Sequence, residues 1–350
     1  MARILLGMNG GTDSSVAAWM LKRDAHEVVG VTLRIHGLSV DDKMCAESAR
    51  ICMQLGIEHH VVDATALFNE KVLNPFVASC NQGVCPDLEA VCLSEVLFPA
   101  LVQLRQRFDC SSIATGHYAQ VKHGRSGIGL RPLQLHRAHD KFADQSYLLY
   151  GMSQDALNLT VLPLADYGKA EVRKEAMRSG LQRIVPLGSN KGMCFPLEGG
   201  FANFLEKTGQ LTPVPGEIVA LGTETVLGTH KGLYHYAFGQ EVDVNGMGVA
   251  LHVVAKDPAT NRLYVGPSAL SAVEERVVTN VNWTSIMPPE EKRSCRAKVS
   301  FGATPAPCQM TVLSPDKVHV AFNQPVEGIA SGSPIVFYSD KLVLAGGLAE

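Results

Sequence analysis

The first turn of the chain constrains the fold more than any other feature. Residues 7–15 read Gly-Met-Asn-Gly-Gly-Thr-Asp-Ser-Ser and follow the short apolar run at residues 4–6. Because Gly10 and Gly11 carry no Cβ, the backbone can turn tightly and bring its N–H groups close to a polyanion. A helix start follows, with two good N-cap residues and then apolar residues at helical spacing: Asp13, Ser14, Val16, Trp19 and Met20. The pattern predicts an anion site suited to pyrophosphate, with an ordinary strand–turn–helix junction as the alternative.

This loop is neither of the two common phosphate-binding motifs. No Gly-Lys-Ser/Thr follows it, and its glycines lack the spacing of the dinucleotide fingerprint. It resembles the Ser-Gly-Gly-x-Asp-Ser loop of the ATP pyrophosphatases, with Asn9 in place of the first serine. We therefore expect ATP, with Mg²⁺ near Asp13, to contact the loop and the ends of two later strands, at Gly7, Met8, Asn9, Gly10, Gly11, Thr12, Asp13, Ser14, Leu33 and Gly116.

Up to about residue 185, apolar strand-like runs alternate with helical patterns. Strands are predicted at 26–33, 58–62 and 112–115, and helices at 42–55 and 95–108. Such alternation predicts a doubly wound α/β fold with a parallel sheet, in which ligands lie beyond the carboxyl ends of the strands.

The pattern changes near residue 200. Beyond Thr212, Gly and Pro punctuate short β-rich segments, and helical periodicity is almost absent from Arg276 onward. We expect strands at 217–221, 249–254, 262–265, 318–322, 334–337 and 341–344. The predicted domains are a nucleotide-binding domain at 1–200, a small β-rich domain at 201–271 and a C-terminal β-barrel at 272–350.

Composition limits the classes of ligand and the cellular compartment that the chain suits. The net charge of −3 argues against a general nucleic-acid coat, although a local basic face can still contact a structured RNA. The odd number of cysteines, nine, indicates reduced thiols in a cytoplasmic protein rather than a disulfide framework. No signal peptide is visible at the N-terminus, and no apolar run is long enough to span a membrane.

Several isolated residues are candidates for chemistry. His117 follows a predicted strand, where a histidine contacts a ligand or is simply structural. Cys194 lies beside a glycine-bearing loop and Lys191, so it is either an activated thiol or an inert buried one. Cys45 and Cys52 share a helix face with Ala49, which indicates a core position. In contrast, Pro and Gly interrupt the stretch with Cys80, Cys85 and Cys92, where a thiol could be accessible; a three-cysteine Fe–S site there is an alternative.

Taken in order, these pieces resemble the tRNA-specific 2-thiouridylases along nearly the whole chain. Beyond the loop, the matching segments are Ala114-Thr115-Gly116-His117-Tyr118-Ala119, Asp144-Gln145-Ser146-Tyr147, Lys169-Ala170-Glu171-Val172-Arg173, Met193-Cys194-Phe195, Leu227-Gly228-Thr229-His230-Lys231-Gly232, Phe238-Gly239-Gln240, Leu263-Tyr264-Val265-Gly266 and Val336-Phe337-Tyr338.

The resemblance places the family's nucleophile at Cys92 and its persulfide at Cys194. It implies tRNA or base contacts at Asp87, Leu88, Glu89, His117, Ala143, Asp144, Gln145, Ser300, Phe301 and Ser333. Several of these depart from the family pattern: Asp87 and Leu88 replace Asn-Pro, Ala143 replaces a lysine, Ser300-Phe301 replaces Arg-Tyr and Ser333 replaces a glutamine. The chain thus resembles a divergent member of that family.

The activity implied is ATP-dependent thiolation of C2 of the wobble uridine (U34) of tRNA, with release of AMP and pyrophosphate. A sulfur-donating desulfurase or relay protein would supply a persulfide, and a transient disulfide between Cys92 and Cys194 would complete the exchange. Two alternatives remain open. One is an ATP-dependent ligase or amidating enzyme with the same loop, and the other is a paralogue that binds nucleotide or tRNA without thiolating.

Basic residues cluster in two places that would suit RNA. One predicted helix carries Arg173, Lys174 and Arg178, with Arg183 beyond it, and a later segment carries Lys292, Arg293, Arg296 and Lys298. We expect tRNA to dock between the two clusters, with His117 and Gln145 at the mouth of the site.

Overall fold

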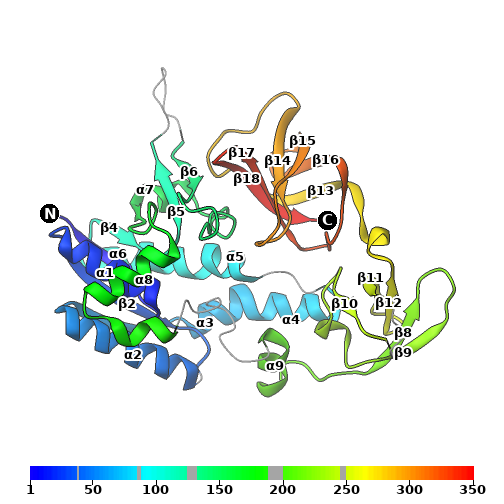
Figure 1. Ribbon diagram of the computed structural model, residues 1–350, viewed down its shortest axis with the longest axis horizontal. Coiled ribbons are helices and arrows are strands. Elements are labelled where there is room, and N and C mark those ends of the chain that lie inside the picture. Colours follow the sequence, from blue (N-terminus) through cyan, green and yellow to red (C-terminus); the bar gives the residue numbers. More distant parts are fainter. Residues whose placement is uncertain (38, 85–87, 124–131, 188–199, 245–249) are drawn as a thin grey trace.

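A computed structural model describes residues 1–37, 39–84, 88–123, 132–187, 200–244 and 250–350. Three β-assemblies follow one another along the chain, and a group of helices lies between them (Figure 1). Among these described residues, the helices are too short or too polar to cross a bilayer.

The first assembly is a five-stranded, fully parallel sheet in the order β3-β2-β1-β4-β7. Its strands are β1 (Arg3–Gly7), β2 (Glu27–Arg34), β3 (Glu58–Asp63), β4 (Ser112–Ala114) and β7 (Thr160–Val161). The strand order reverses direction at β1 and β4, and a ligand is expected at the carboxyl ends of such a pair. The predicted doubly wound fold is confirmed.

Helices cover both faces of this sheet because alternate side chains of β1 point to opposite sides. Ile4 and Leu6 pack with α1 (Thr12–Arg23), α2 (Ser39–Leu55), α8 (Lys169–Arg178) and the 3₁₀ turn η3 (Gln182–Leu187). Leu5 faces a second core, built with α6 (Phe98–Arg107) and α7 (Gln154–Leu159).

Between β3 and α6 the described residues form two runs of helical turns. The first contains α3 (Thr65–Phe68), the π-helical turn η1 (Asn69–Leu73) and α4 (Asn74–Asn81). The second contains α5 (Leu88–Cys92) and a second π-helical turn, η2 (Leu93–Leu97). The predicted helix at 95–108 therefore begins within a π turn. Gly83, just beyond α4, lies against Pro258, so α4 reaches from the parallel sheet toward the second assembly (Figure 1).

The second assembly is a five-stranded sheet in the order β10-β11-β12-β8-β9. It contains β8 (Gly216–Ala220), β9 (Val226–His230), β10 (Glu241–Val242), β11 (Leu251–Asp257) and β12 (Arg262–Gly266). Helix α9 (Gly200–Lys207) precedes it, and the 3₁₀ turns η4 (Leu233–His235) and η5 (Ser268–Ser271) lie within and after it.

The third assembly is a closed antiparallel barrel. Its strands are β13 (Val273–Asn282), β14 (Arg293–Lys298), β15 (Ala306–Ser314), β16 (Lys317–Val326), β17 (Pro334–Ser339) and β18 (Leu342–Ala349), and the β13–β18 pairing closes it. The predicted C-terminal barrel is confirmed.

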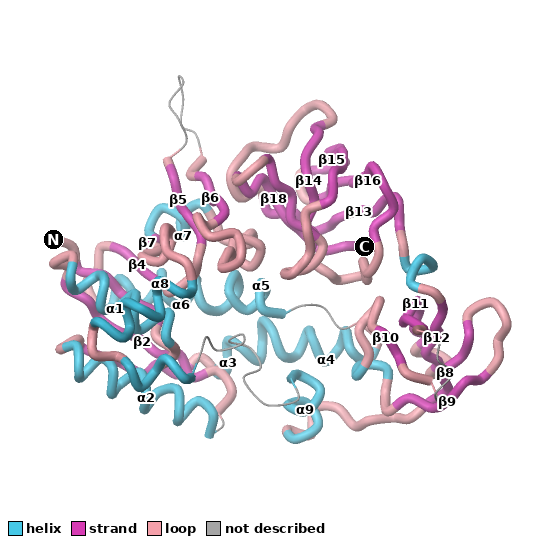
Figure 2. The backbone as a smooth tube through the Cα atoms, in the orientation of Figure 1, coloured by secondary structure: helices cyan, strands magenta, loops and turns pink. Residues whose placement is uncertain are grey.

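A hairpin from the first part of the chain joins the barrel sheet, which the sequence did not predict. Strands β5 (Ala119–Lys122) and β6 (Gln134–Arg137) pair with each other, and β6 continues the sheet at β18, with His136 opposite Leu342 (Figure 2). The same hairpin leads into the loop that carries Gln145, so the barrel edge and the nucleotide-binding fold support one loop together.

Candidate functional site

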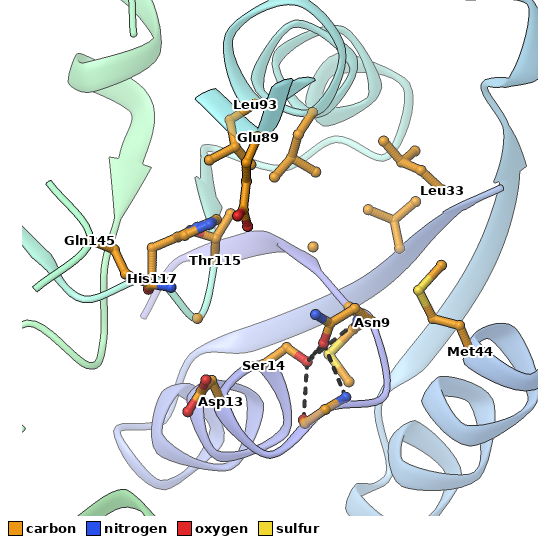
Figure 3. A pocket seen from close by; sticks show the side chains of 16 residues that line it. Asn9, Asp13, Ser14, Leu33, Met44, Glu89, Leu93, Thr115, His117 and Gln145 are labelled. Carbon is orange, nitrogen blue, oxygen red and sulfur yellow. Dashed lines mark hydrogen bonds between the residues drawn. The ribbon is translucent and has the colours of Figure 1, made fainter. Parts of the chain in front are cut away.

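An open cavity lies at the carboxyl ends of the parallel strands, where a doubly wound fold is expected to bind its ligand (Figure 3). Most of the residues predicted to contact ATP line it: Gly7, Met8, Asn9, Gly11, Asp13, Ser14, Leu33 and Gly116. Glu89, His117 and Gln145 line the same cavity, so the glycine loop and three predicted base-contacting residues share one space. Sequence reasoning missed the apolar lining residues Val31, Met44, Leu93 and Leu97, and also Thr115.

The side chain of Asn9 organises the glycine loop from within. Its Oδ1 accepts hydrogen bonds from Gly11 N at 3.0 Å and from Ser14 Oγ at 2.7 Å (Figure 3). Asn9 N in turn donates to Ser14 Oγ at 3.4 Å. The departure from the family's serine therefore preserves an ordered loop, because the longer amide bridges the two ends of the turn.

The cap of α1 differs from the prediction. The N-cap residue is Gly11, without a side-chain cap, whereas Asp13 and Ser14 lie inside the first turn. Thr12 and Gly10 do not line the cavity. Thr12 Oγ1 donates to Ile184 O at 3.0 Å, and Gly10 adopts φ +71° at a position where a Cβ would lie 3.0 Å from Glu47 Cβ of α2. These two residues fix the conformation of the loop on the side away from the cavity.

Gly116 provides the second wall of the cradle at the end of β4. A Cβ at this position would lie 2.7 Å from the backbone atoms Asp13 C and Ser14 N. Only glycine lets the strand end approach the first turn of α1 so closely, since backbone cannot move aside as a flexible side chain can.

Two donors clamp the carboxylate of Asp13. Tyr118 Oη donates to Oδ1 at 2.6 Å and Lys169 Nζ donates to Oδ2 at 2.7 Å, while the Lys169 ammonium also lies 4.1 Å from the Tyr118 ring centroid. The segments with Tyr118 and Lys169 were recognised only as matching motifs. A strand end and a helix start are thus tied to the phosphate loop.

This clamp does not fit the expected magnesium ligand at Asp13. A hydroxyl occupies one carboxylate oxygen and an ammonium ion-pairs with the other, so a divalent cation there would meet the Lys169 charge at close range. The donor set indicates that Asp13 positions Lys169 beside the loop rather than holding a metal.

His117 is held as a neutral ring at the cavity wall. Its Nδ1 lies 2.9 Å from Thr115 Oγ1, and burial lowers its pKa to about 4. Next to it, Gln145 N donates to Tyr118 O at 2.8 Å and Gln145 Oε1 accepts from Tyr118 N at 3.0 Å. Around neutral pH His117 can exchange hydrogen bonds with a ligand but carries no charge.

The lowered pKa of His117 predicts a specific loss of stability in mild acid. A histidine in the unfolded chain binds a proton near pH 6.5, whereas folded His117 does so near pH 4. Between these values the unfolded state holds more protons, so stability falls as the pH is lowered. In His117→Asn the loss between pH 7 and pH 5 should shrink by on the order of 1–2 kcal/mol. Urea unfolding at both pH values measures this, and an unchanged difference would contradict the buried, neutral ring.

Comparison with known proteins assigns the chain to a family. Residues 2–197 match the model described as tRNA methyl transferase HUP domain, residues 202–267 the tRNA methyl transferase PRC-barrel domain, and residues 273–349 the aminomethyltransferase beta-barrel domain. A tRNA-specific 2-thiouridylase of Synechococcus sp. (strain CC9902) is 38% identical, covering 99% of this chain and 92% of the relative. Its counterpart in Rippkaea orientalis is 35% identical over 100% of both chains. The chain belongs to the tRNA-specific 2-thiouridylase family.

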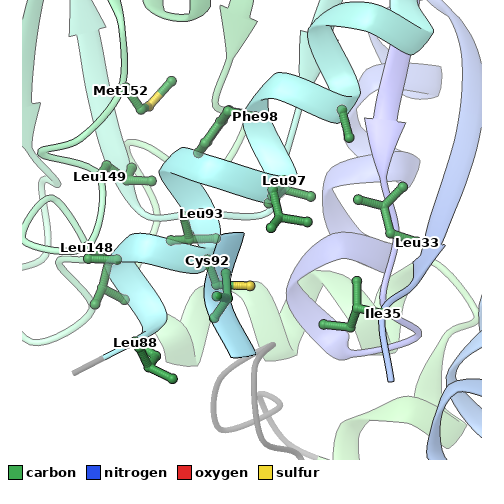
Figure 4. Packing of buried hydrophobic residues seen from close by; sticks show 14 of the residues in the cluster. Leu33, Ile35, Leu88, Cys92, Leu93, Leu97, Phe98, Leu148, Leu149 and Met152 are labelled. Carbon is green, nitrogen blue, oxygen red and sulfur yellow. The ribbon is translucent and has the colours of Figure 1, made fainter. Parts of the chain in front are cut away.

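In this member of the 2-thiouridylase family, the predicted nucleophile Cys92 is fully buried. It ends α5 and packs within the core that includes Leu33, Leu93 and Leu148 (Figure 4). Cys80 is also buried, so the expectation of accessible thiols at these two positions is wrong for this conformation. Gly83 follows the end of α4, yet both cysteines remain buried. Cys85, Cys194 and Asp87 lie outside the described residues.

The helix with Cys45 and Cys52 fits its core prediction only in part. Cys52 is fully buried, and burial raises its thiol pKa to about 12. Cys45 is half-buried, whereas Ala49 is exposed. The buried stripe of α2 is therefore narrower than the spacing suggested.

The residues predicted to contact tRNA separate into two groups. Glu89, His117 and Gln145 line the cavity, and Ser300 and Phe301 are exposed on the loop after β14, with Ser333 half-buried. Leu88, Ala143 and Asp144 are buried; the Asp144 carboxylate accepts from Arg137 Nε at 2.7 Å and from two backbone N–H groups. Within this arrangement these three support the site rather than line it.

The barrel cluster of basic residues must also be corrected. Lys298 is only 6% exposed, and its ammonium lies 5.5 Å from the Tyr147 ring and 5.4 Å from the Phe301 ring. Burial lowers its pKa. It joins the barrel to the loop of residues 138–151 and is not a free phosphate contact, whereas Arg296, Arg173 and Lys174 are exposed.

No group of three or more His, Cys, Asp or Glu residues within the described parts of the chain is arranged to hold a metal ion. Cys80 and Cys92 are described and belong to one apolar cluster. The described part of the alternative three-cysteine Fe–S site thus consists of two buried core thiols.

Proposed function

We propose that this protein is an ATP-dependent tRNA-uridine 2-sulfurtransferase that thiolates C2 of the wobble uridine, U34. The observation that carries the proposal is the single cavity that joins the glycine loop to Glu89, His117 and Gln145, in a chain related over its full length to tRNA-specific 2-thiouridylases. We further propose domains at 1–200, 201–271 and 272–350, supported by the three separate family matches.

The first step activates the uridine. The C2 carbonyl oxygen is a poor leaving group, so it attacks the α-phosphorus of ATP and expels pyrophosphate, which leaves C2 bonded to an adenylate. The backbone N–H groups at the start of α1 stabilise the charge that develops on the pyrophosphate. Lys169, fixed by Asp13, places an ammonium donor beside the loop. Magnesium would accompany the nucleotide phosphates, and no step here depends on it.

The second step transfers sulfur. The terminal sulfur of a Cys194 persulfide attacks C2, and AMP departs with the former carbonyl oxygen. The Cys92 thiolate then attacks the Cys194 sulfur, which forms a Cys92–Cys194 disulfide and releases the thiocarbonyl. A dithiol reductant returns two electrons to restore both thiols.

This chemistry requires Cys92 to leave the core in which it is packed. The π-helical turn η2 begins at the next residue, and π turns are irregularities often found at functional sites. Opening α5 at this turn would expose the sulfur while α6 stays packed.

We also propose a sulfur donor, a route for the tRNA and a cellular location. A cysteine desulfurase or sulfur-relay protein would load Cys194, and the tRNA would enter by the cavity mouth. A cytoplasmic location would keep the thiols reduced. An Fe–S cluster in place of the persulfide would need Cys92 and Cys194 as ligands, and iron with acid-labile sulfide in anaerobically purified protein would favour it.

An ATP–pyrophosphate exchange assay with and without total tRNA tests the proposal. Exchange that depends on tRNA, together with retarded tRNA migration in a mercury-containing gel after persulfide loading, is expected. Exchange that needs no tRNA and survives loss of Cys194 would instead identify a ligase or amidating enzyme. Binding without exchange would identify a non-thiolating paralogue.

The exposed cations of α8 should contribute phosphate contacts. Neutralising Arg173 and Lys174 to glutamine should weaken binding of every tRNA alike, because phosphates carry no sequence information. The slope of log affinity against log salt should fall by about one contact per charge removed. Titrations at several salt concentrations measure this. Lys207→Gln with Lys317→Gln, on α9 and β16, removes equal charge elsewhere; an equal effect there would show that α8 is not the docking face.

A further inference from the structure

The turn that precedes Gln145 presents an aromatic ring to solvent. Phe142 is 88% exposed, more than any other aromatic side chain that the structure describes. A single exposed apolar residue needs no explanation by itself. The ordered backbone that holds this ring and the cations beside it do call for one.

The backbone on either side of Phe142 is fixed. Phe142 N donates to Asp140 Oδ1 at 2.9 Å, and Ala143 N donates to Asp140 O at 3.2 Å. Ala143 and Asp144, which follow, are 3% and 4% exposed. The turn is anchored in the protein on its C-terminal side, so the ring is presented outward by an ordered backbone rather than by a loose loop.

The turn connects the start of α8 to a residue of the cavity wall. Asp140 packs against Gly168, where a Cβ would lie 2.7 Å from Asp140 Oδ2, and Gly168 is the N-cap of α8. The next residue, Lys169, holds Asp13 of the phosphate loop. On the other side, Gln145 lines the cavity. Phe142 therefore lies between the start of α8 and a residue of the site wall.

Cations lie beside the ring and on the neighbouring helix α8. Lys141 Nζ lies 5.0 Å from the Phe142 ring centroid, and Arg173 and Lys174 are exposed on α8. The two carboxylates nearby, Asp140 and Glu171, both accept backbone N–H groups. A flat apolar face next to cations matches an unpaired nucleotide, which offers a base to stack and a phosphate to pair.

We propose that Phe142 is a stacking platform for a base next to the target uridine in the anticodon loop, with Lys141 contacting the adjoining phosphate. The inference rests on the proposed function. To reach the cavity, the uridine must leave its stack, and its neighbour then loses a stacking partner. The ring at the mouth replaces that partner, so Phe142 contributes to RNA affinity and not to ATP binding.

Binding of a fluorescently labelled anticodon stem–loop RNA, followed by anisotropy at several salt concentrations, tests this. Phe142→Leu keeps an apolar side chain without a π face and should weaken binding roughly tenfold with an unchanged salt slope. Phe142→Tyr should bind as the parent does. Lys141→Gln should flatten the salt slope by about one phosphate contact. Met53→Ala, which alters a residue that is 78% exposed on α2, is the matched control, and ATP affinity should be equal in all four variants.

The outcomes separate the stacking platform at Phe142 from the proposed thiolation function. If the parent protein binds RNA and Phe142→Leu binds equally well, the platform is wrong while the proposed function stands, and the ring would then serve a protein partner. If the parent protein binds no RNA, the proposed function fails and the platform fails with it. A loss in Phe142→Leu that Phe142→Tyr does not share supports the stacking role, because a merely structural defect would also lower ATP affinity.

Discussion

Replacing Cys194 or Cys92 with serine should eliminate tRNA thiolation while tRNA-dependent ATP–pyrophosphate exchange persists. The exchange reports adenylation, which needs neither sulfur atom. The transfer needs both, because a hydroxyl can neither carry a persulfide nor form a disulfide. Retardation of the tRNA in a mercury-containing gel measures the product, and labelled sulfur bound to the protein measures the carrier. We expect no protein-bound label in Cys194→Ser and retained label in Cys92→Ser.

The burial of Cys92 demands a matched control. Serine in an apolar core leaves a hydroxyl to be satisfied, so Cys92→Ala is tested beside Cys92→Ser to separate chemistry from stability. Cys52→Ala removes another fully buried thiol from the core on the opposite face of the sheet, and Cys110→Ser alters a third buried thiol; both should retain thiolation. Persulfide label that survives in Cys194→Ser would overturn the assignment of the carrier.

The phosphate cradle was predictable because its determinants are local. Strand, glycines and helix follow one another within residues 3–23, and the ends of parallel strands necessarily meet at one edge of the sheet. This rule placed Gly116 and His117 beside residues 7–15 from spacing alone, and the cavity joins them.

The clamp on Asp13 was not predictable from pattern. Tyr118 lies 105 residues from Asp13 along the chain and Lys169 lies 156 residues away. A carboxylate in a nucleotide loop is equally consistent with a metal ligand and with an ion pair. Only the tertiary structure decides between these two roles. Here Asp13 forms the ion pair with Lys169, which does not fit a magnesium ligand.

The exposure of cysteines failed as a prediction for a related reason. Pro and Gly near Cys80 and Cys92 indicate a break in regular structure, which is usually a surface feature. Here the described helical turns that carry Cys80 and Cys92 pack into one core, together with residues from α6 and the loop before α7. The pairing of β6 with β18 was also not predictable. It joins segments about two hundred residues apart, and no local periodicity encodes such a pairing.

Gly116→Ala should abolish measurable ATP binding. The added Cβ would lie 2.7 Å from Asp13 C and Ser14 N, closer than carbon and nitrogen can approach, so the end of β4 must separate from the first turn of α1. That displacement moves the backbone N–H groups that receive pyrophosphate, and positioning errors of this size are costly in a preorganised site. Isothermal titration with ATP measures the affinity, with the thermal midpoint recorded to confirm a folded chain.

A second glycine, Gly10 within the loop itself, provides an independent test. Gly10 adopts φ +71°, and a Cβ there would lie 3.0 Å from Glu47 Cβ, so Gly10→Val combines backbone strain with a clash against α2 and should also abolish binding. Gly302→Ala is the control, because no atom lies within 4 Å of the added methyl group. Since Gly10 lies within the loop and Gly116 contacts it from the end of β4, both variants must lose ATP if the loop is the cradle. Unchanged affinity in the two of them would move the nucleotide site away from residues 7–15.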